Sequence, residues 1–126
     1  MRGDRIKSLK LFRDHADIER NMQKTSDADR DLIVKYMEDD AFLRGMFVSP
    51  MIDTFDKKTE ITAATYTDGK YLWNSQLVHW IRSYSVRVPD EFIAHVRNST
   101  IPSEDKWAVR NVRHDNLMAA EPIFLE

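Results

Sequence analysis

The segment Ile61–Arg97, with the sequence ITAATYTDGKYLWNSQLVHWIRSYSVRVPDEFIAHVR, decides the fold of this chain. Two β-prone runs flank Asp68-Gly69, and two amphipathic helical patterns follow, divided at Pro89. Asp-Gly between such runs is a strong hairpin signal, because a type I′ turn needs positive φ at both central residues. The segment therefore predicts a β-hairpin followed by two short helices.

The first of these helices is predicted to begin after Asn74, whose side chain is a suitable N-cap. Four apolar residues recur at i, i+3, i+4 and i+7 and define its buried face: Leu77, Trp80, Ile81 and Tyr84. His79 falls on the opposite face and is expected to be exposed.

The second helix is predicted to start at Pro89, because proline suits the first helical position and Asp90 and Glu91 suit the positive end of the helix dipole. Its core residues are expected to be Phe92, Ile93 and Val96, and Asn98 is a candidate terminator.

A further strand is predicted before the hairpin. Met51–Phe55 alternates in a strand-like way, Asp56–Thr59 has turn composition, and Glu60–Tyr66 is rich in β-branched residues. With Tyr71–Trp73, these runs predict a three-stranded antiparallel meander with one face covered by helices.

Two helices are predicted at the N-terminus. In Asp4–Lys24, four residues follow a helical spacing and indicate the first helix: Leu11, His15, Ile18 and Met22. Ser26 is a candidate N-cap for a second helix over Asp27–Asp39. Asp40 is expected to cap a short turn at Ala41–Arg44, closed by Gly45.

The predicted fold class is therefore α+β in a single domain of 126 residues, a length that suits one hydrophobic core. Residues 1–47 form the helical part, 48–73 the meander and 74–98 the two short helices. Residues 99–126 are weakly patterned, although Ser103 and Trp107 favour one further helix.

The composition indicates a globular protein of the cytoplasm. Hydrophobic residues make up 42% of the chain and charged residues 32%, and no apolar run has the length of a membrane span. The basic N-terminus lacks the apolar stretch of a secretory signal. The chain has no cysteine, which excludes disulfides, thiolate metal ligands and a cysteine nucleophile.

The charge is unevenly distributed along the chain. Residues 1–24 contain seven Lys/Arg and four Asp/Glu, whereas residues 25–60 contain five and nine. This pattern lacks the basic face with aromatic platforms that nucleic acid requires, so no nucleic-acid partner is expected. The acidic middle is either a solvated helix face or a surface for a basic protein.

No catalytic residue or cofactor is predicted. The three glycines supply neither GxGxxG nor GxxxxGK, and no serine lies in a nucleophile elbow. Asp53 and Asp56 would point to opposite faces of a regular strand, so they do not form a catalytic pair.

The histidines give one alternative hypothesis. His15 lies on the apolar stripe of the first predicted helix and is expected to be a structural, hydrogen-bonded residue. Glu91 and His95 lie at i and i+4 on one helix face and could supply half of a metal site. Zinc sites normally use three or four protein ligands, so a simple surface pair is the competing interpretation.

Two groups of residues are candidates for binding a protein partner. One is the acidic helix, represented by Asp31, Glu38, Asp39 and Asp40. The other is Tyr71 with Trp73, which share a strand face and form an aromatic patch if the helices leave that face open. If the helices cover it, the same two residues belong to the core.

Four runs of sequence carry a resemblance to a known group of proteins: TDGKYLW (67–73), LVHWI (77–81), VPDEF (88–92) and IAHV (93–96). Together they resemble a segment of small bacterial proteins, some of which look like immunity proteins of polymorphic or contact-dependent toxin systems. The resemblance spans Thr67–Val96, and its matching residues are mainly structural. It implies a protein that occludes a toxin and carries no catalytic motif.

The leading hypothesis is a non-enzymatic, cytoplasmic protein-binding module, specifically an immunity protein that neutralises a basic toxin domain. One alternative is a small metal-assisted hydrolase or nucleic-acid-processing enzyme that uses Glu91 and His95, or an acidic cluster with a metal. The other is a structural protein that associates with copies of itself.

Overall fold

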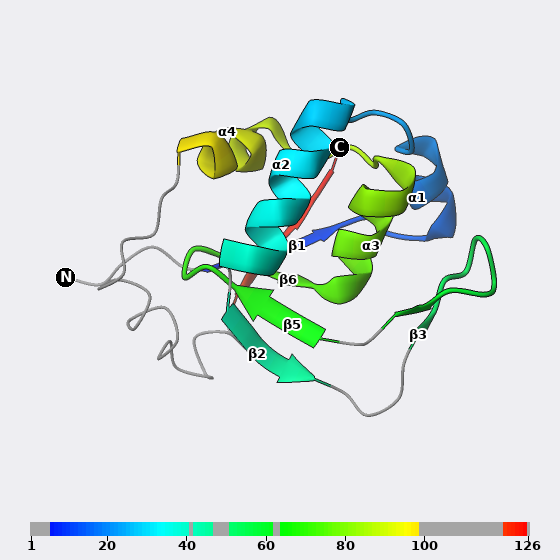
Figure 1. The fold of residues 1–126 in the computed structure, drawn as a ribbon, viewed down its shortest axis with the longest axis horizontal. Coiled ribbons are helices and arrows are strands. Elements are labelled where there is room, and N and C mark those ends of the chain that lie inside the picture. Colours follow the sequence, from blue (N-terminus) through cyan, green and yellow to red (C-terminus); the bar gives the residue numbers. More distant parts are fainter. Residues whose placement is uncertain (1–5, 41, 47–50, 62–63, 99–119, 126) are drawn as a thin grey trace.

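The computed structural model describes residues 6–40, 42–46, 51–61, 64–98 and 120–125 (Figure 1). Within these residues the chain has an α+β fold, with a five-stranded mixed sheet, a separate two-stranded hairpin and four α-helices. The predicted fold class is therefore confirmed.

The main sheet has the strand order β2-β5-β6-β1-β7. Its strands are β1 (Lys7–Leu11), β2 (Phe42–Met46), β5 (Ala64–Thr67), β6 (Tyr71–Asn74) and β7 (Glu121–Phe124). Strand β5 is antiparallel to β2 and β6, whereas β1 is parallel to both β6 and β7. Segments from both ends of the chain therefore complete the sheet.

The helices pack together on one face of this sheet (Figure 1). They are α1 (His15–Arg20), α2 (Asp27–Lys35), α3 (Ser75–Tyr84) and α4 (Asp90–Asn98), and a π-helical turn, η1 (Tyr36–Asp40), continues α2. Helix α2 contacts both α3 and α4, so it occupies the centre of the helical layer.

The two-stranded hairpin is a separate element beside α3, called the small hairpin below. It pairs β3 (Met51–Ile52) with β4 (Glu60–Ile61) in antiparallel register, Met51 opposite Ile61 and Ile52 opposite Glu60. Figure 1 shows it at the side of the molecule, away from the main sheet.

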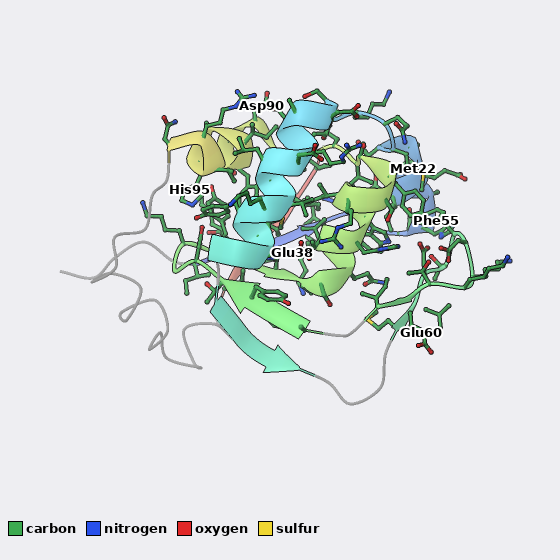
Figure 2. All side chains as sticks on the ribbon, viewed as in Figure 1. Met22, Glu38, Phe55, Glu60, Asp90 and His95 are labelled. Carbon is green, nitrogen blue, oxygen red and sulfur yellow. The ribbon has the colours of Figure 1, made fainter. Side chains whose placement is uncertain are left out.

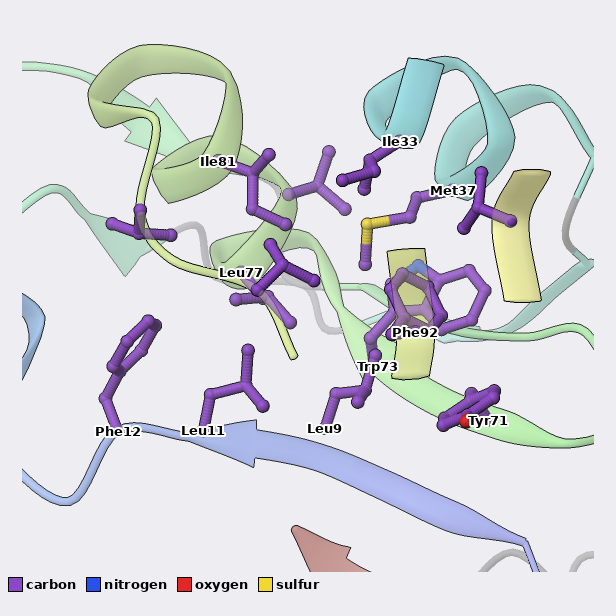
Figure 3. Packing of buried hydrophobic residues seen from close by; sticks show 14 of the residues in the cluster. Leu9, Leu11, Phe12, Ile33, Met37, Tyr71, Trp73, Leu77, Ile81 and Phe92 are labelled. Atoms are coloured by element: carbon purple, nitrogen blue, oxygen red, sulfur yellow. The ribbon is translucent and has the colours of Figure 1, made fainter. Parts of the chain in front are cut away.

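One hydrophobic core joins the sheet to the helices (Figure 3). Its central residues come from two strands, three α-helices and η1: Leu9, Leu11, Tyr71, Trp73, Ile33, Met37, Leu77, Ile81, Phe92 and Val96. Tyr71 and Trp73 lie two residues apart and therefore share the covered face of β6.

Local capping explains where the helices begin. The Ser26 side chain accepts a hydrogen bond from the Asp29 N–H at the start of α2. The Asn74 side chain does the same for the Leu77 N–H at 2.9 Å. Both predicted caps are confirmed, as are the helix after Pro89 and the hairpin at Asp68-Gly69.

The predicted helix over Asp4–Lys24 is wrong in its first half. Lys7–Leu11 forms β1, and helix begins only at His15. Leu9 and Leu11 alternate with exposed Lys10, which is the spacing of a strand, and both are almost completely buried. Parallel pairing with β6 and β7, far away in sequence, determines this structure.

Leu11 marks the change from strand to helix. It has a φ of 60°, in the left-handed region that residues with a side chain seldom adopt. Its side chain is nevertheless fully buried, and its carbonyl accepts a hydrogen bond from the Leu125 N–H at 2.8 Å. Core packing and pairing with the C-terminal segment thus hold the residue in this conformation.

The predicted meander is also wrong. The strand expected at Met51–Phe55 ends at Ile52, and it pairs with Glu60–Ile61 in the small hairpin instead of joining the main sheet. The place beside β5 is taken by β2, so the predicted short turn closed by Gly45 is replaced by a strand. The helix proposed near Trp107 lies outside the described residues.

The turn between β5 and β6 differs from the type I′ turn that was predicted. Gly69 has a φ of 96°, whereas Asp68 does not have positive φ. The Asp68 carboxylate instead accepts hydrogen bonds from the backbone N–H groups of Lys70 and Tyr71, at 2.9 and 2.8 Å. An aspartate side chain, rather than a second left-handed residue, closes this turn.

The position of β1 gives a direct test. Leu9→Ala is expected to lower the free energy of unfolding by about 2–4 kcal/mol, because it leaves a cavity under the helices. Lys10→Ala, next to it on the exposed side of β1, is the matched control and is expected to change little. Denaturant unfolding measures both, and equal effects would contradict the placement of Leu9 in the core.

Candidate functional site

Two buried aspartates dominate the polar chemistry of the described residues. Asp53 has 0% of its surface exposed and Asp68 has 6%. Each lies at a chain reversal, and each accepts hydrogen bonds from a tyrosine hydroxyl, a histidine Nε2 and the backbone of its own turn. Such partners are what a buried carboxylate needs to offset its lost hydration.

Asp53, His79 and Tyr84 form one cluster, called the Asp53 cluster below, which connects the small hairpin to α3. The carboxylate Oδ2 accepts from His79 Nε2 and from the Tyr84 hydroxyl, both at 2.6 Å, and Oδ1 accepts from the Phe55 N–H at 2.7 Å. The Phe55 ring then packs edge-on against Tyr84 and stacks on His15 of α1.

The protonation states in this cluster follow from its hydrogen bonds. Burial alone would raise the pKa of Asp53, but the bonds from Tyr84, His79 and the Phe55 N–H outweigh it and lower the pKa. The bond to Asp53, aided by burial, raises the pKa of Tyr84 to about 12. At neutral pH, Asp53 is therefore ionised and Tyr84 is a donor, so Nε2 of His79 carries the proton that faces Asp53.

Asp68, Tyr36 and His95 form a second cluster, called the Asp68 cluster below, which connects the β5–β6 turn to η1 and α4. Figure 2 shows where His95 lies on α4. Oδ2 of Asp68 accepts from the Tyr36 hydroxyl of η1 at 2.5 Å and lies 2.7 Å from Nε2 of His95 on α4. The His95 ring also packs against Tyr71, with centroids 4.9 Å apart. His95 thus contacts Asp68 and, at 3.3 Å, the Tyr36 hydroxyl, while the Glu91 carboxylate pairs with Lys7.

A pocket of about 330 Å³ lies between β4, β5 and α3, and is called the hairpin pocket below. The polar and charged residues among its lining include Glu38, Glu60, Tyr66, Ser75, His79 and Arg82. His79 belongs both to this lining and to the Asp53 cluster. The cluster therefore fixes one wall of the pocket.

The charged groups of the hairpin pocket are unequally paired. Glu38 forms an ion pair with Arg82, and these side chains are 42% and 49% exposed. Glu60 is exposed and forms no ion pair with any residue that the structure describes. The lining has more carboxylate than guanidinium groups, so its field favours a cation.

The arrangement around His79 resembles part of a hydrolase relay but lacks an essential component. Ser83 Oγ lies 3.4 Å from His79 Nδ1, and Asp53 orients the ring from the other side. Ser83 lies inside α3, however, where the neighbouring N–H groups are used in helical hydrogen bonds. They are not available as an oxyanion hole, so acyl transfer at Ser83 is not supported.

The structure adds no third ligand to the metal site proposed at Glu91 and His95. Oε2 of Glu91 lies 3.7 Å from Nζ of Lys7, and His95 is bound to Asp68. In the described part of the chain, no three His, Asp or Glu side chains are placed to hold a metal ion.

Among the described residues, no helix has both the length and the apolar composition that a membrane span requires.

The predicted partner-binding residues have different environments. Asp31 is exposed and paired with Arg30, while Glu38 lines the hairpin pocket. Asp39 and Asp40 lie in η1, and their side chains are outside the description.

The structure decides between the two interpretations of Tyr71 and Trp73 and excludes the exposed aromatic patch. Tyr71 is 7% exposed and Trp73 is 2% exposed, because the helices cover the strand face that both residues share. Their alternative interpretation as core residues is confirmed.

Two predictions of histidine exposure are also wrong. His79 was expected to be exposed, but it is largely buried and bound to Asp53, which is distant in sequence. His15 was expected on an apolar stripe, but it is exposed and stacks on Phe55; the hydrogen bond expected for it is present, because its Nδ1 lies 3.3 Å from the Thr54 hydroxyl. Both errors arise because the small hairpin approaches these residues from a distant part of the sequence.

Sequence reasoning missed both Asp–His clusters. Their members are 26 and 27 residues apart, so no local motif contains them. One signal was available: two turn aspartates, Asp53 and Asp68, precede two helical histidines, His79 and His95, by nearly the same interval. The chemical meaning of that interval depends on the tertiary structure.

No family model, curated protein or solved structure matches this chain. The resemblance of Thr67–Val96 to bacterial immunity proteins therefore stays a hypothesis. The residues behind it mostly serve the fold, including Asp68 and Gly69 in the β5–β6 turn and Trp73 in the core.

Replacing Asp53 tests the first cluster. Asp53→Asn places an NH2 group next to the donors of His79, Tyr84 and the Phe55 N–H. It is therefore expected to lower the free energy of unfolding by about 1–3 kcal/mol at neutral pH. Because folding lowers the pKa of Asp53, its contribution is present above the unfolded value of about 3.9 and is lost as pH falls through the folded pKa.

Unfolding free energies between neutral and acidic pH measure this effect. The Asp53→Asn protein is expected to lose less stability on acidification than the parent protein. Asp31→Asn, at an exposed position, is the control and is expected to follow the parent. Parallel acid profiles for Asp53→Asn and the parent would contradict the assignment.

Proposed function

We propose that this protein is a non-enzymatic protein-binding module and, specifically, an immunity protein that neutralises a cognate bacterial toxin. The observation that carries the proposal is an apolar pair on the small hairpin. Met51 and Ile52 are adjacent and are 39% and 46% exposed, next to the strand that lines the hairpin pocket.

An exposed apolar pair of this kind is suited to protein contact. Adjacent residues of a strand point to opposite faces, so Met51 and Ile52 leave apolar surface exposed on both faces of the small hairpin, and Ile52 shares its face with Glu60 of the pocket lining. The Asp53 cluster and the Phe55 ring contacts hold the small hairpin against α3 and α1. A surface that is already ordered loses less conformational entropy when it binds.

The acidic face of α2 is less suitable for binding a basic partner than its sequence indicated. Asp27 and Asp31 both pair with Arg30, and Asp29 pairs with Arg97. These internal ion pairs neutralise much of the charge that would attract a basic partner. The proposed interface is therefore centred on the small hairpin, with Glu38 at its edge.

The repeated Asp–His–Tyr arrangement supports a structural role for these residues in place of catalysis. Asp68, Tyr36 and His95 reproduce the contacts of the Asp53 cluster, although none of the three lines the hairpin pocket. The task that both clusters share is to anchor a chain reversal to helices. Support for the toxin partner itself comes from the resemblance of Thr67–Val96.

Co-expression with the products of the adjacent genes tests the proposal. We expect a complex with a toxin-like neighbour, detected by size-exclusion chromatography with light scattering. Ile52→Asp places a charge in the apolar contact and is expected to weaken the complex on the order of tenfold or more. Leu32→Asp, at a residue of α2 that is 40% exposed, is the matched control and should bind normally.

Three results would overturn the proposal or its interface. Failure of every neighbouring product to bind rejects the immunity function. Normal binding by Ile52→Asp together with lost binding by Leu32→Asp moves the interface to α2. A homo-oligomer that Ile52→Asp dissociates supports self-association instead.

A further inference from the structure

We infer that the hairpin pocket receives a basic side chain, arginine or lysine, from the protein that the small hairpin binds. This inference rests on the proposed function and specifies the chemistry of the partner. It is based on the size of the pocket, the pairing of its charges and its position beside Ile52.

The size of the pocket limits what it can hold. Its volume of about 330 Å³ is near the lower end of the roughly 300–1,000 Å³ range of small-molecule sites. One long side chain is a suitable occupant for such a volume, whereas a dinucleotide cofactor would need a larger site.

The charges favour a cation over an anion. Arg82 is already paired with Glu38, so an entering anion would have to displace that carboxylate. Glu60 has no ion-pair partner among the described residues and can accept a new one without breaking an existing contact. The ionised Asp53 behind His79 adds negative potential to the same wall.

Tyr66 provides the second element of a cation site. It lies on β5, lines the pocket and packs partly buried against the core. An aromatic ring next to a carboxylate is a favourable setting for a guanidinium or ammonium group, through ion pairing and cation–π attraction. Glu60 and Tyr66 thus reach the pocket from two different strands.

The register of the small hairpin links this pocket to the apolar pair. Ile52 lies directly opposite Glu60 on the neighbouring strand, so their side chains are neighbours on the hairpin surface. A partner segment that places a cation at Glu60 therefore brings its adjacent residues over Ile52. The expected epitope is a basic residue flanked by apolar ones.

The test uses Nα-acetyl-arginine N-methylamide as the probe and follows amide signals by NMR. Its matched control is the citrulline derivative, which has nearly the same shape but no charge. We expect the arginine probe to shift the signals of Glu60, Ile61 and His79, and the citrulline probe to have little effect. Glu60→Gln is expected to weaken arginine binding about two- to fivefold, the range for one partly exposed ion pair.

Asp90→Asn is the control variant. Asp90 is an exposed acidic residue on α4, and Figure 2 shows it on the opposite side of the molecule from Glu60. This variant should bind the arginine probe like the parent protein. Its amide spectrum and that of Glu60→Gln also report whether each variant is folded.

The inference is overturned if the arginine and citrulline probes shift the same signals equally, if neither shifts them, or if Glu60→Gln binds like the parent. Its failure is distinguishable from failure of the proposed function. A protein complex that depends on Ile52, without arginine binding, rejects only the pocket assignment. Arginine binding without any protein complex rejects only the proposed function.

Discussion

The fold depends on the need to satisfy two carboxyl groups that are almost completely removed from water. An aspartate buried without donors would cost several kcal/mol, and each of these finds tyrosine, histidine and backbone donors. Hydrogen bonds to Asp53 connect α3 to the small hairpin, and hydrogen bonds to Asp68 connect α4 and η1 to the β5–β6 turn. At two places in the helical layer, therefore, a buried aspartate bonded to a tyrosine and a histidine holds a turn against the helices.

This constraint also shapes the surface that we propose for binding. The small hairpin has strands of only two residues each, too short for independent stability. Its position depends on Asp53, on the stacking of Phe55 on His15 and on the edge-on contact of Phe55 with Tyr84. The hairpin pocket exists because that anchoring places Glu60 opposite His79 and Arg82 of α3. His79 therefore has two roles: it binds Asp53, which anchors the small hairpin, and it lines the hairpin pocket.

The segment Ile61–Arg97 illustrates how far local sequence can predict a fold. Asn74, Pro89 and the apolar spacing of Leu77 and Ile81 act within a few residues, and the elements that they predict are present. The same local reasoning was wrong for Lys7–Leu11, because a strand in the interior of a sheet is determined by its neighbours. It was also wrong for the meander, because pairing partners cannot be read from strand propensity.

By itself, the sequence determined the α+β class, the helix starts at Ser26 and Asn74 and the turn at Asp68-Gly69, since caps and turns act over three or four residues. Only the tertiary structure decided that β1 lies between β6 and β7, and that Asp53 and Asp68 each meet a histidine from 26 or 27 residues away. The physical reason is that hydrogen bonds to buried carboxylates and strand pairing join groups by proximity in space, which local spacing does not encode.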